Sequence, residues 1–120
     1  MDVTLTKDRS TWQALLEEIT LGRRGQRVTL EIMDEELGDQ TPAHGMPLDS
    51  IAYDPHDDVI VVGLTGQGPG DHVVLRHIVT SPRSLDLLEQ PGDTLVLQVV
   101  DGTDVQTLVI FTPAVAAQPV

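Results

Sequence analysis

The hydrophobic positions near the start of the chain predict one amphipathic helix over residues Thr11–Leu21. Four apolar side chains recur there at i, i+3, i+4 and i+7, which places them on one face of a helix. Ser10 is a favourable N-cap, and Gln13 follows it at capping-box spacing. A glycine at position 22 or 25 can end the helix in a left-handed conformation. The four apolar residues are Trp12, Leu15, Leu16 and Ile19.

Over Arg27–Met33, apolar and polar residues alternate, which is the period of a half-buried β-strand. The segment Ile51–Pro82 organises the chain. It predicts three strands, joined by a turn at Asp54–Asp58 and by the glycine-rich stretch Gly66–Gly70. A hairpin with Asp101-Gly102 as its tight turn follows. The predicted strands are Arg27–Met33, Leu48–Tyr53, Asp58–Thr65, His72–Thr80, 94–101 and 104–111.

The remaining segments have weaker patterns. Residues 34–45 are polar, contain glycine and proline and lack a period, which predicts a loop. Ser84–Glu89 predicts one helical turn, residues 1–6 predict either a short edge strand or a lead-in, and residues 113–120 predict a loose tail. We therefore expect a single domain over residues 1–120 of the α+β class, mostly β. It should hold one N-terminal helix packed on a strongly bent antiparallel sheet or small barrel of about six strands.

Composition narrows the possible functions. The 120 residues include no cysteine, which excludes disulfides, thiolate zinc sites and cysteine catalysis. The net charge of −12 opposes binding to nucleic acid and to anionic membranes. The N-terminus does not resemble a signal peptide, and no stretch approaches the ~20 apolar residues of a membrane helix. We therefore expect a cytoplasmic protein without nucleic-acid or membrane partners.

No group of residues predicts catalysis. Carboxylates crowd the turn Asp54–Asp58, but they lack the alternating spacing of a calcium loop, so a hairpin turn is the better interpretation. The histidines are dispersed, and His72 and His77 fall on opposite faces of one predicted strand. Gly66–Gly70 precedes a strand, whereas a phosphate-binding loop precedes a helix. We expect no metal, no cofactor and no enzymatic activity.

Two functions remain as hypotheses. The predicted strands Val59–Leu64 and Leu95–Val100 are apolar on both faces, which favours a non-enzymatic domain that binds a protein partner or associates with itself. The alternative is a small-molecule or ion site near the turn Asp54–Asp58 and the bend His77–Arg83. That site requires four side chains to converge in one pocket. The candidate ligand-binding residues are Tyr53, Asp54, His77 and Arg83.

Several short motifs recur in the order that one family shows. They are the helix with Trp12, the turn Tyr53-Asp54-Pro55, the pair His77-Ile78 followed by Ser81-Pro82-Arg83, and the hairpin turn Asp101-Gly102. In these motifs the chain resembles, over nearly its whole length, a prokaryotic family known as domain of unknown function 5335. The resemblance implies a mostly-β fold with one helix, and it implies no particular activity, substrate or cofactor.

Overall fold

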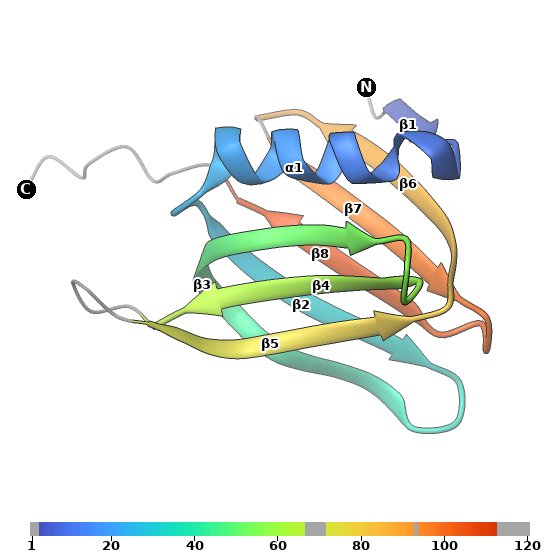
Figure 1. The fold of residues 1–120 in the computed structure, drawn as a ribbon. Coiled ribbons are helices and arrows are strands. Elements are labelled where there is room, and N and C mark those ends of the chain that lie inside the picture. Colours follow the sequence, from blue (N-terminus) through green and yellow to red (C-terminus); the bar gives the residue numbers. More distant parts are fainter. Residues whose placement is uncertain (1–2, 67–71, 93, 113–120) are drawn as a thin grey trace, which may run out of the picture.

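A computed structural model describes residues 3–66, 72–92 and 94–112. These residues form one α-helix over a strongly curled antiparallel sheet of eight strands in the order β1-β6-β7-β8-β2-β3-β4-β5 (Figure 1). The predicted helix on a strongly bent antiparallel sheet is confirmed, and the sheet does not close into a barrel. The elements are β1 Val3–Thr6, the 3-10 turn η1 Arg9–Thr11, α1 Trp12–Arg23, β2 Arg27–Asp34, β3 Gly38–Asp54, β4 Val59–Thr65, β5 Val73–Thr80, β6 Pro82–Gln90, β7 Thr94–Asp101 and β8 Gln106–Phe111.

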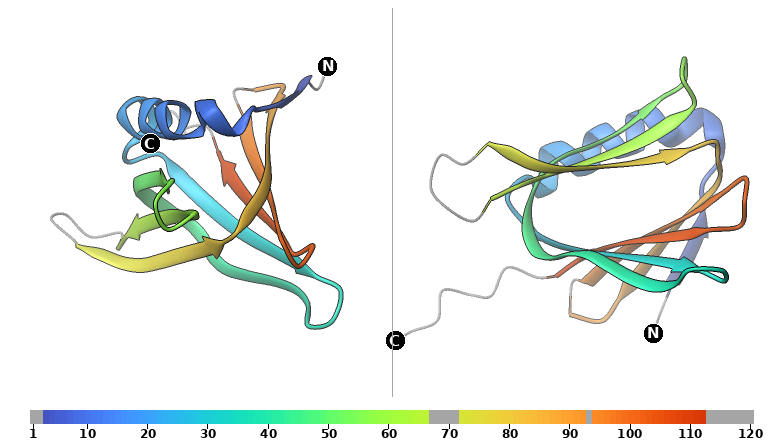
Figure 2. Two further views of the ribbon diagram at one scale, coloured as in Figure 1. Left: turned by 45° about the vertical axis from the view of Figure 1, so that its right-hand side comes forward. Right: turned by 90° about the horizontal axis from the view of Figure 1, so that it is seen from below.

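The curl of the sheet comes from β3, which spans 17 residues and belongs to two halves. Its residues 38–47 pair with β2, and its residues 48–54 pair with β4. Gly45, at φ +62°, lies just before the change of partner and adopts a conformation that favours glycine. We call β1, β6, β7, β8, β2 and residues 38–47 the rear half, and residues 48–54 with β4 and β5 the front half. Figure 2 shows that the two halves face each other beneath α1.

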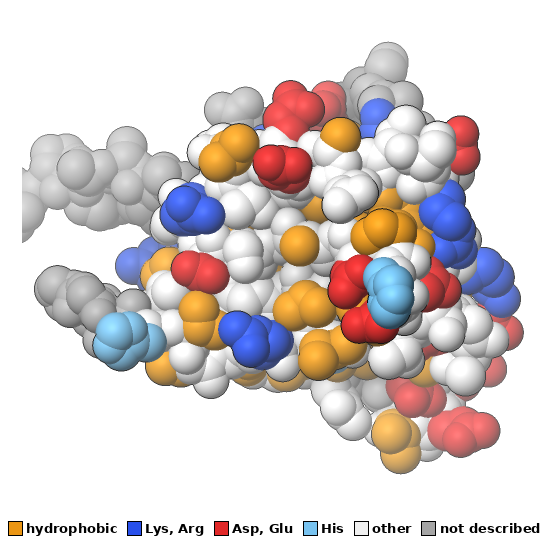
Figure 3. Space-filling model, viewed as in Figure 1, with side chains coloured by type: hydrophobic (Ala, Val, Ile, Leu, Met, Phe, Trp, Pro, Cys, Tyr) orange, Lys and Arg blue, Asp and Glu red, His pale blue; other side chains and the backbone are white. Residues whose placement is uncertain are grey.

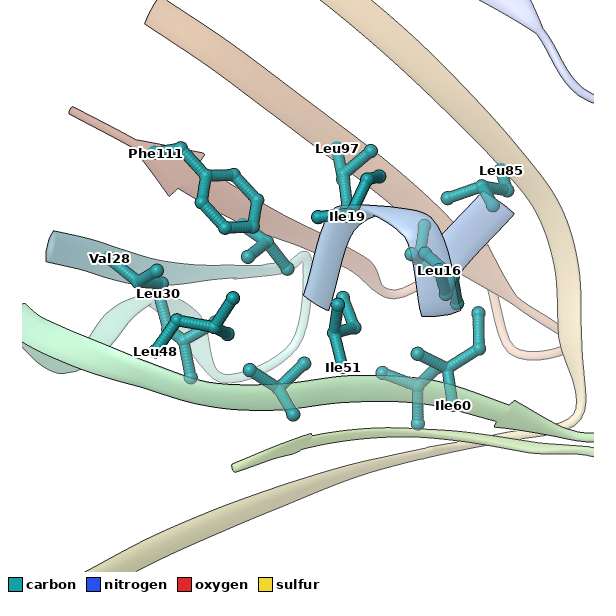
Figure 4. Packing of buried hydrophobic residues seen from close by; sticks show 14 of the residues in the cluster. Leu16, Ile19, Val28, Leu30, Leu48, Ile51, Ile60, Leu85, Leu97 and Phe111 are labelled. Carbon is teal, nitrogen blue, oxygen red and sulfur yellow. The ribbon is translucent and has the colours of Figure 1, made fainter. Parts of the chain in front are cut away.

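The core fills the space between the two halves and the helix. Alternate residues of β2 to β8 point inward, and α1 adds Leu16 and Ile19 from the stripe that the sequence predicted (Figure 4). Trp12, from the same stripe, is also buried. Leu, Val and Ile dominate, as the low aromatic content requires. Each fully buried side chain of this size stabilises the fold by about 1.5–3 kcal/mol. The largest buried strand residues are Phe111, Leu30, Leu48, Ile51, Ile60, Leu64, Leu85, Leu97, Val28 and Val62.

α1 begins and ends within two residues of the predicted bounds, but its N-terminal cap differs from the prediction. The predicted cap at Ser10 is wrong, because the Ser10 hydroxyl donates to the Asp8 carboxylate and a 3-10 turn precedes the helix. The Thr11 N–H and hydroxyl both donate to the Asp8 carbonyl oxygen. At the other end, Gly25 adopts φ +89° and its N–H donates to the Leu48 carbonyl oxygen. Among the described residues, no helix is long and apolar enough to cross a membrane.

The predicted loop over residues 34–45 is wrong. Only a short turn separates β2 from β3, and the Asp34 carboxylate accepts the N–H groups of Glu36 and Leu37 in it. The glycines and prolines of this segment, which led to the loop prediction, are tolerated in the strand because residues 38–47 pair on one side only. Pro42 lies at one of two register shifts, where a missing N–H breaks no ladder bond.

The predicted helical turn at Ser84–Glu89 is also wrong, because these residues belong to β6. Leu85 and Leu87 are buried at alternate positions, and β6 lies between β1 and β7. Pairing on both sides outweighs the helix preference of leucine and glutamate. Val3–Thr6 forms β1 on the far side of β6, so the edge-strand alternative for the N-terminus is correct.

The C-terminal hairpin of β7 and β8 is confirmed, but its turn is longer than predicted. The Asp101 carboxylate accepts N–H groups from Thr103 and Val105, and the left-handed residue is Asp104 at φ +67°. β4 and β5 also pair as predicted. Most of the glycine-rich stretch, residues 67–70, lies outside the described residues, and so does the predicted tail at 113–120.

Candidate functional site

The four predicted ligand-binding residues lie on three different elements. Tyr53 and Asp54 end β3, His77 lies within β5, and Arg83 follows the first residue of β6. Tyr53 and His77 face the inside of the curled sheet, because their register partners Ile60 and Val62 point into the core. Asp54 and Arg83 are exposed. The structure therefore does not gather the four side chains into one site.

Tyr53 belongs to a hydrogen-bonded cluster around Arg9, a residue that the sequence did not single out. The Arg9 guanidinium donates to the Tyr53 hydroxyl at 3.1 Å, to the Asp58 carboxylate at 2.8 Å and to the Pro82 carbonyl oxygen at 2.6 Å. The Tyr53 hydroxyl donates to the same Asp58 oxygen at 2.8 Å. The Arg9 guanidinium also lies 4.5 Å from the centre of the Trp12 ring. The bond to Tyr53 raises the pKa of Arg9 above its usual value, so this group stays charged.

The Arg9 cluster joins segments that are distant in the sequence. Asp58 follows β3, whereas Pro82 begins β6. Asp58 and Ser81 both adopt positive φ, and the Ser81 N–H donates to the Asp58 carbonyl oxygen at 3.0 Å. The Tyr53 hydroxyl and the Asp58 carboxylate are thus engaged with Arg9 and with each other. The cluster therefore holds the N-terminal segment against the turn before β4 and the bend between β5 and β6, which is a structural role.

The turn between β3 and β4 is built by its own carboxylates. The Asp54 carboxylate accepts the N–H groups of His56 at 2.9 Å and Asp57 at 3.4 Å, and the exposed His56 ring contacts the Asp57 carboxylate. This is the local bonding by which aspartate favours turns. In the described part of the chain, no three histidine or carboxylate side chains are placed to hold a metal ion.

Arg83 lies on another surface. Its guanidinium forms an exposed ion pair with Asp104, in the connection between β7 and β8. Pairs of this exposure contribute about 0–1 kcal/mol to stability.

None of four cavities among the described residues brings the four predicted ligand-binding residues together. A cavity of about 450 Å³ lies between the turns at Asp34 and Thr103. Another, of about 440 Å³, lies between α1 and the strands β6 and β7. Tyr53 lines a smaller cavity of about 240 Å³ beside α1. Asp54, His77 and Arg83 line none of the four.

His77 is half-buried, and burial lowers its pKa below the usual value of 6.5. The folded state therefore binds this proton more weakly than the unfolded chain does. Stability is retained above the unfolded pKa and is lost as the pH falls from 6.5 towards the lower folded value. We expect His77→Gln to lose less stability between pH 7.5 and pH 5.5 than the wild type, as measured by urea midpoints.

His56→Gln is the matched control, because it makes the same substitution at an exposed histidine. A reduced loss of stability in both variants would trace the effect to the substitution itself rather than to the burial of His77. Equal losses in the His77 variant and the wild type would show that His77 does not contribute to acid sensitivity.

The surface that stands out is the outer face of the front half together with its edge, β5. β5 pairs with β4 and ends the sheet. Its outward side chains include Val74, which is 63% exposed, and Ile78, which is 51% exposed. Ile78 continues a row with Val61 and Ala52 across the front half. Figure 3 views this face, where hydrophobic side chains lie at the surface between polar ones.

Among the described residues, the other edges of the sheet are short, irregular or covered, and the β5 edge is none of these. β1 has only four residues, and residues 38–47 of β3 contain prolines and two register shifts, which discourage pairing. Residues 48–54 are covered by α1. The Thr20 hydroxyl accepts the Ile51 N–H at 2.9 Å and lies 2.8 Å from its carbonyl oxygen, while Arg24 donates to the Asp49 carbonyl oxygen. β5 has eight residues, no proline and a regular register from Val59 to Leu64.

Comparisons with known proteins agree with the resemblance noted in the sequence. A protein of Aquifex aeolicus (strain VF5), described as uncharacterized, is 26% identical over 107 residues, which cover 89% of this chain and 90% of that protein. No solved structure matches significantly. The sequence profile of the family of unknown function DUF5335 matches residues 3–120. The chain therefore belongs to the family of unknown function DUF5335.

Proposed function

We propose that this domain is a non-enzymatic binding module that adds an extended protein segment to its sheet along β5. The observation that carries the proposal is the unprotected edge with Val74 and Ile78 exposed beside it. The unpaired N–H and carbonyl groups of an edge strand provide main-chain affinity for another strand. Side chains at alternate positions provide selectivity, as in other domains that bind by strand addition.

The apolar outer face supports the same proposal. A segment beside β5 would lie next to Val74 and Ile78 and cover part of both side chains. On the rear half, the outward-facing Val96 is 8% exposed and Met33 is 37% exposed, against 63% for Val74 and 51% for Ile78. These two β5 side chains therefore leave more apolar surface to bury than the two rear-half side chains do. The alternative ligand site gains no such support, because Tyr53, Asp54, His77 and Arg83 lie apart. A cytoplasmic location stays a prediction from the sequence.

Peptide selection tests the proposal. Random 12-residue peptides displayed on phage are selected on the intact domain, and the affinities of the selected peptides are then measured by fluorescence polarisation. We expect the double variant Val74→Lys/Ile78→Lys to bind these peptides at least tenfold more weakly. Burial of one such side chain contributes about 1.5–3 kcal/mol, and 1.4 kcal/mol is tenfold. Sedimentation velocity of the domain alone measures self-association in the same variants.

Leu37→Lys is the matched control, because Leu37 is 73% exposed in the turn between β2 and β3. This variant adds a lysine to an apolar surface position away from β5, and its affinity should equal that of the wild type. Selected peptides that bind the double variant as tightly as the wild type would place the binding surface elsewhere. Failure to select any peptide, with a monomer in sedimentation at high concentration, would overturn the proposal.

A further inference from the structure

We infer that the segment added to β5 comes from a different protein and carries an acidic residue between two apolar residues at alternate positions. This inference rests on the proposed function and specifies its partner. The argument uses the outward face of β5, formed by Val74, Arg76, Ile78 and Thr80.

Arg76 gives β5 its charge. The strand contains Arg76 and His77 and no acidic residue, although the chain as a whole has a net charge of −12. Arg76 is exposed and makes no ion pair with any described residue. Across the front half, Arg76 on β5 is paired with Gly63 on β4, and Gly63 is paired in turn with Ser50 on β3. Asp49 precedes Ser50 on β3, and no ion pair joins it to Arg76.

The geometry of a sheet predicts which residue types an added strand should carry opposite Arg76, Val74 and Ile78. A residue directly opposite Arg76 on an added strand points to the same outer face, with its Cβ about 4.5–5.5 Å away. The residues two positions before and after it face Val74 and Ile78. An aspartate or glutamate opposite Arg76, with apolar residues on both sides at alternate positions, therefore complements β5.

A second copy of this chain complements β5 less well than a segment with an acidic residue opposite Arg76. A two-fold interface makes each copy use the same surface, and antiparallel pairing keeps outer faces together. The register centred on Arg76 places the two Arg76 residues opposite each other. The register centred on His77 leaves them diagonal, at about 7–8 Å. A register centred on Ile78 separates the charges, but it shortens the β5 overlap to residues 76–80. Like charges so close oppose self-pairing over the full strand.

Selection on matched variants tests the inference. Peptides selected on the wild type should be enriched in Asp or Glu flanked by apolar residues at alternate positions. Replacing the central acid of a selected peptide by lysine should weaken binding about fivefold, the value that corresponds to a cross-strand pair of about 1 kcal/mol. Selection on Arg76→Glu should instead enrich Lys or Arg at the same place. Far-UV circular dichroism verifies that this variant folds, and Arg76→Gln, which should lose the preference, provides a second test.

Arg83→Glu is the control, because it reverses the charge of an exposed arginine on β6 and should keep the preference for acids. Peptides that require Val74 and Ile78 but show no acidic preference would overturn this inference and leave the proposed function standing. A dimer in sedimentation that Ile78→Lys dissociates would also overturn it, because the occupant would then be a second copy. Peptides that bind independently of β5 would overturn both.

Discussion

Replacing Trp12 by alanine is expected to lower the free energy of unfolding by about 3–5 kcal/mol, the range for removing a large buried aromatic side chain. Trp12 is 1% exposed, and its ring packs edge-on against Tyr53 with the ring centres 5.2 Å apart. Its indole N–H donates to the Lys7 carbonyl oxygen at 3.0 Å, and Arg9 lies over its face. The substitution therefore removes a hydrogen bond as well as packing. Trp12 is the single tryptophan of the chain, so the variant has no tryptophan fluorescence by which to follow unfolding. Urea unfolding followed by far-UV circular dichroism measures the effect instead.

Two further variants separate packing from a general effect on α1. Trp12→Phe keeps an aromatic ring but loses the indole N–H, so it should fall between the alanine variant and the wild type. Leu21→Ala changes a side chain on the same helix that is 72% exposed, and it should stay within about 0.5 kcal/mol of the wild type. A Trp12→Ala protein as stable as Leu21→Ala would contradict the arrangement of this core.

Replacing Thr20 by valine should cost about 1–3 kcal/mol, although the two side chains have nearly the same shape. The buried Thr20 hydroxyl accepts the Ile51 N–H and lies within donating distance of the carbonyl oxygens of Ile51 and Leu16. Valine leaves the Ile51 N–H buried without that acceptor. The same urea experiment measures the loss, and hydrogen exchange should show faster exchange of the Ile51 amide.

Thr20→Ser provides the control, since it keeps the hydroxyl and removes one methyl group. It should cost about 0.8 kcal/mol, the value of one buried methylene-sized group. If the serine variant lost more stability than the valine variant, the methyl group rather than the hydroxyl would hold α1 to β3.

The sequence was sufficient wherever a local pattern was strong. The stripe from Trp12 to Ile19 predicted α1, alternation predicted β2, and apolar segments between turn residues predicted β4, β5 and the hairpin of β7 and β8. Residues 38–47 and 82–90 could not be predicted in this way. The first contains glycine and proline at positions that are acceptable only because one side is unpaired, and the second has strong helix formers that pairing on both sides holds extended.

The candidate surface was harder to predict than the fold. Tyr53 was predicted as a ligand-binding residue, and the structure places its hydroxyl beside Arg9 instead. Arg9 is 44 positions away, and no local pattern connects the two residues. His77 and Arg83 are six residues apart, yet the corner at Ser81 sends them to different surfaces. The exposure of β5 depends on which strands end the sheet. That order follows from long-range pairing, which alternation along the chain does not specify.

The order of the strands also constrains how the protein folds during synthesis. β6, β7 and β8 lie between β1 and β2, so the two N-terminal strands acquire these neighbours only after the C-terminal third has been made. β2 pairs with β8, whose last residue is Phe111. Until that residue leaves the ribosome, β2 presents an unpaired edge on that side. Long-range pairing of this kind slows folding, so the nascent chain should depend on protection from aggregation until β8 has been made.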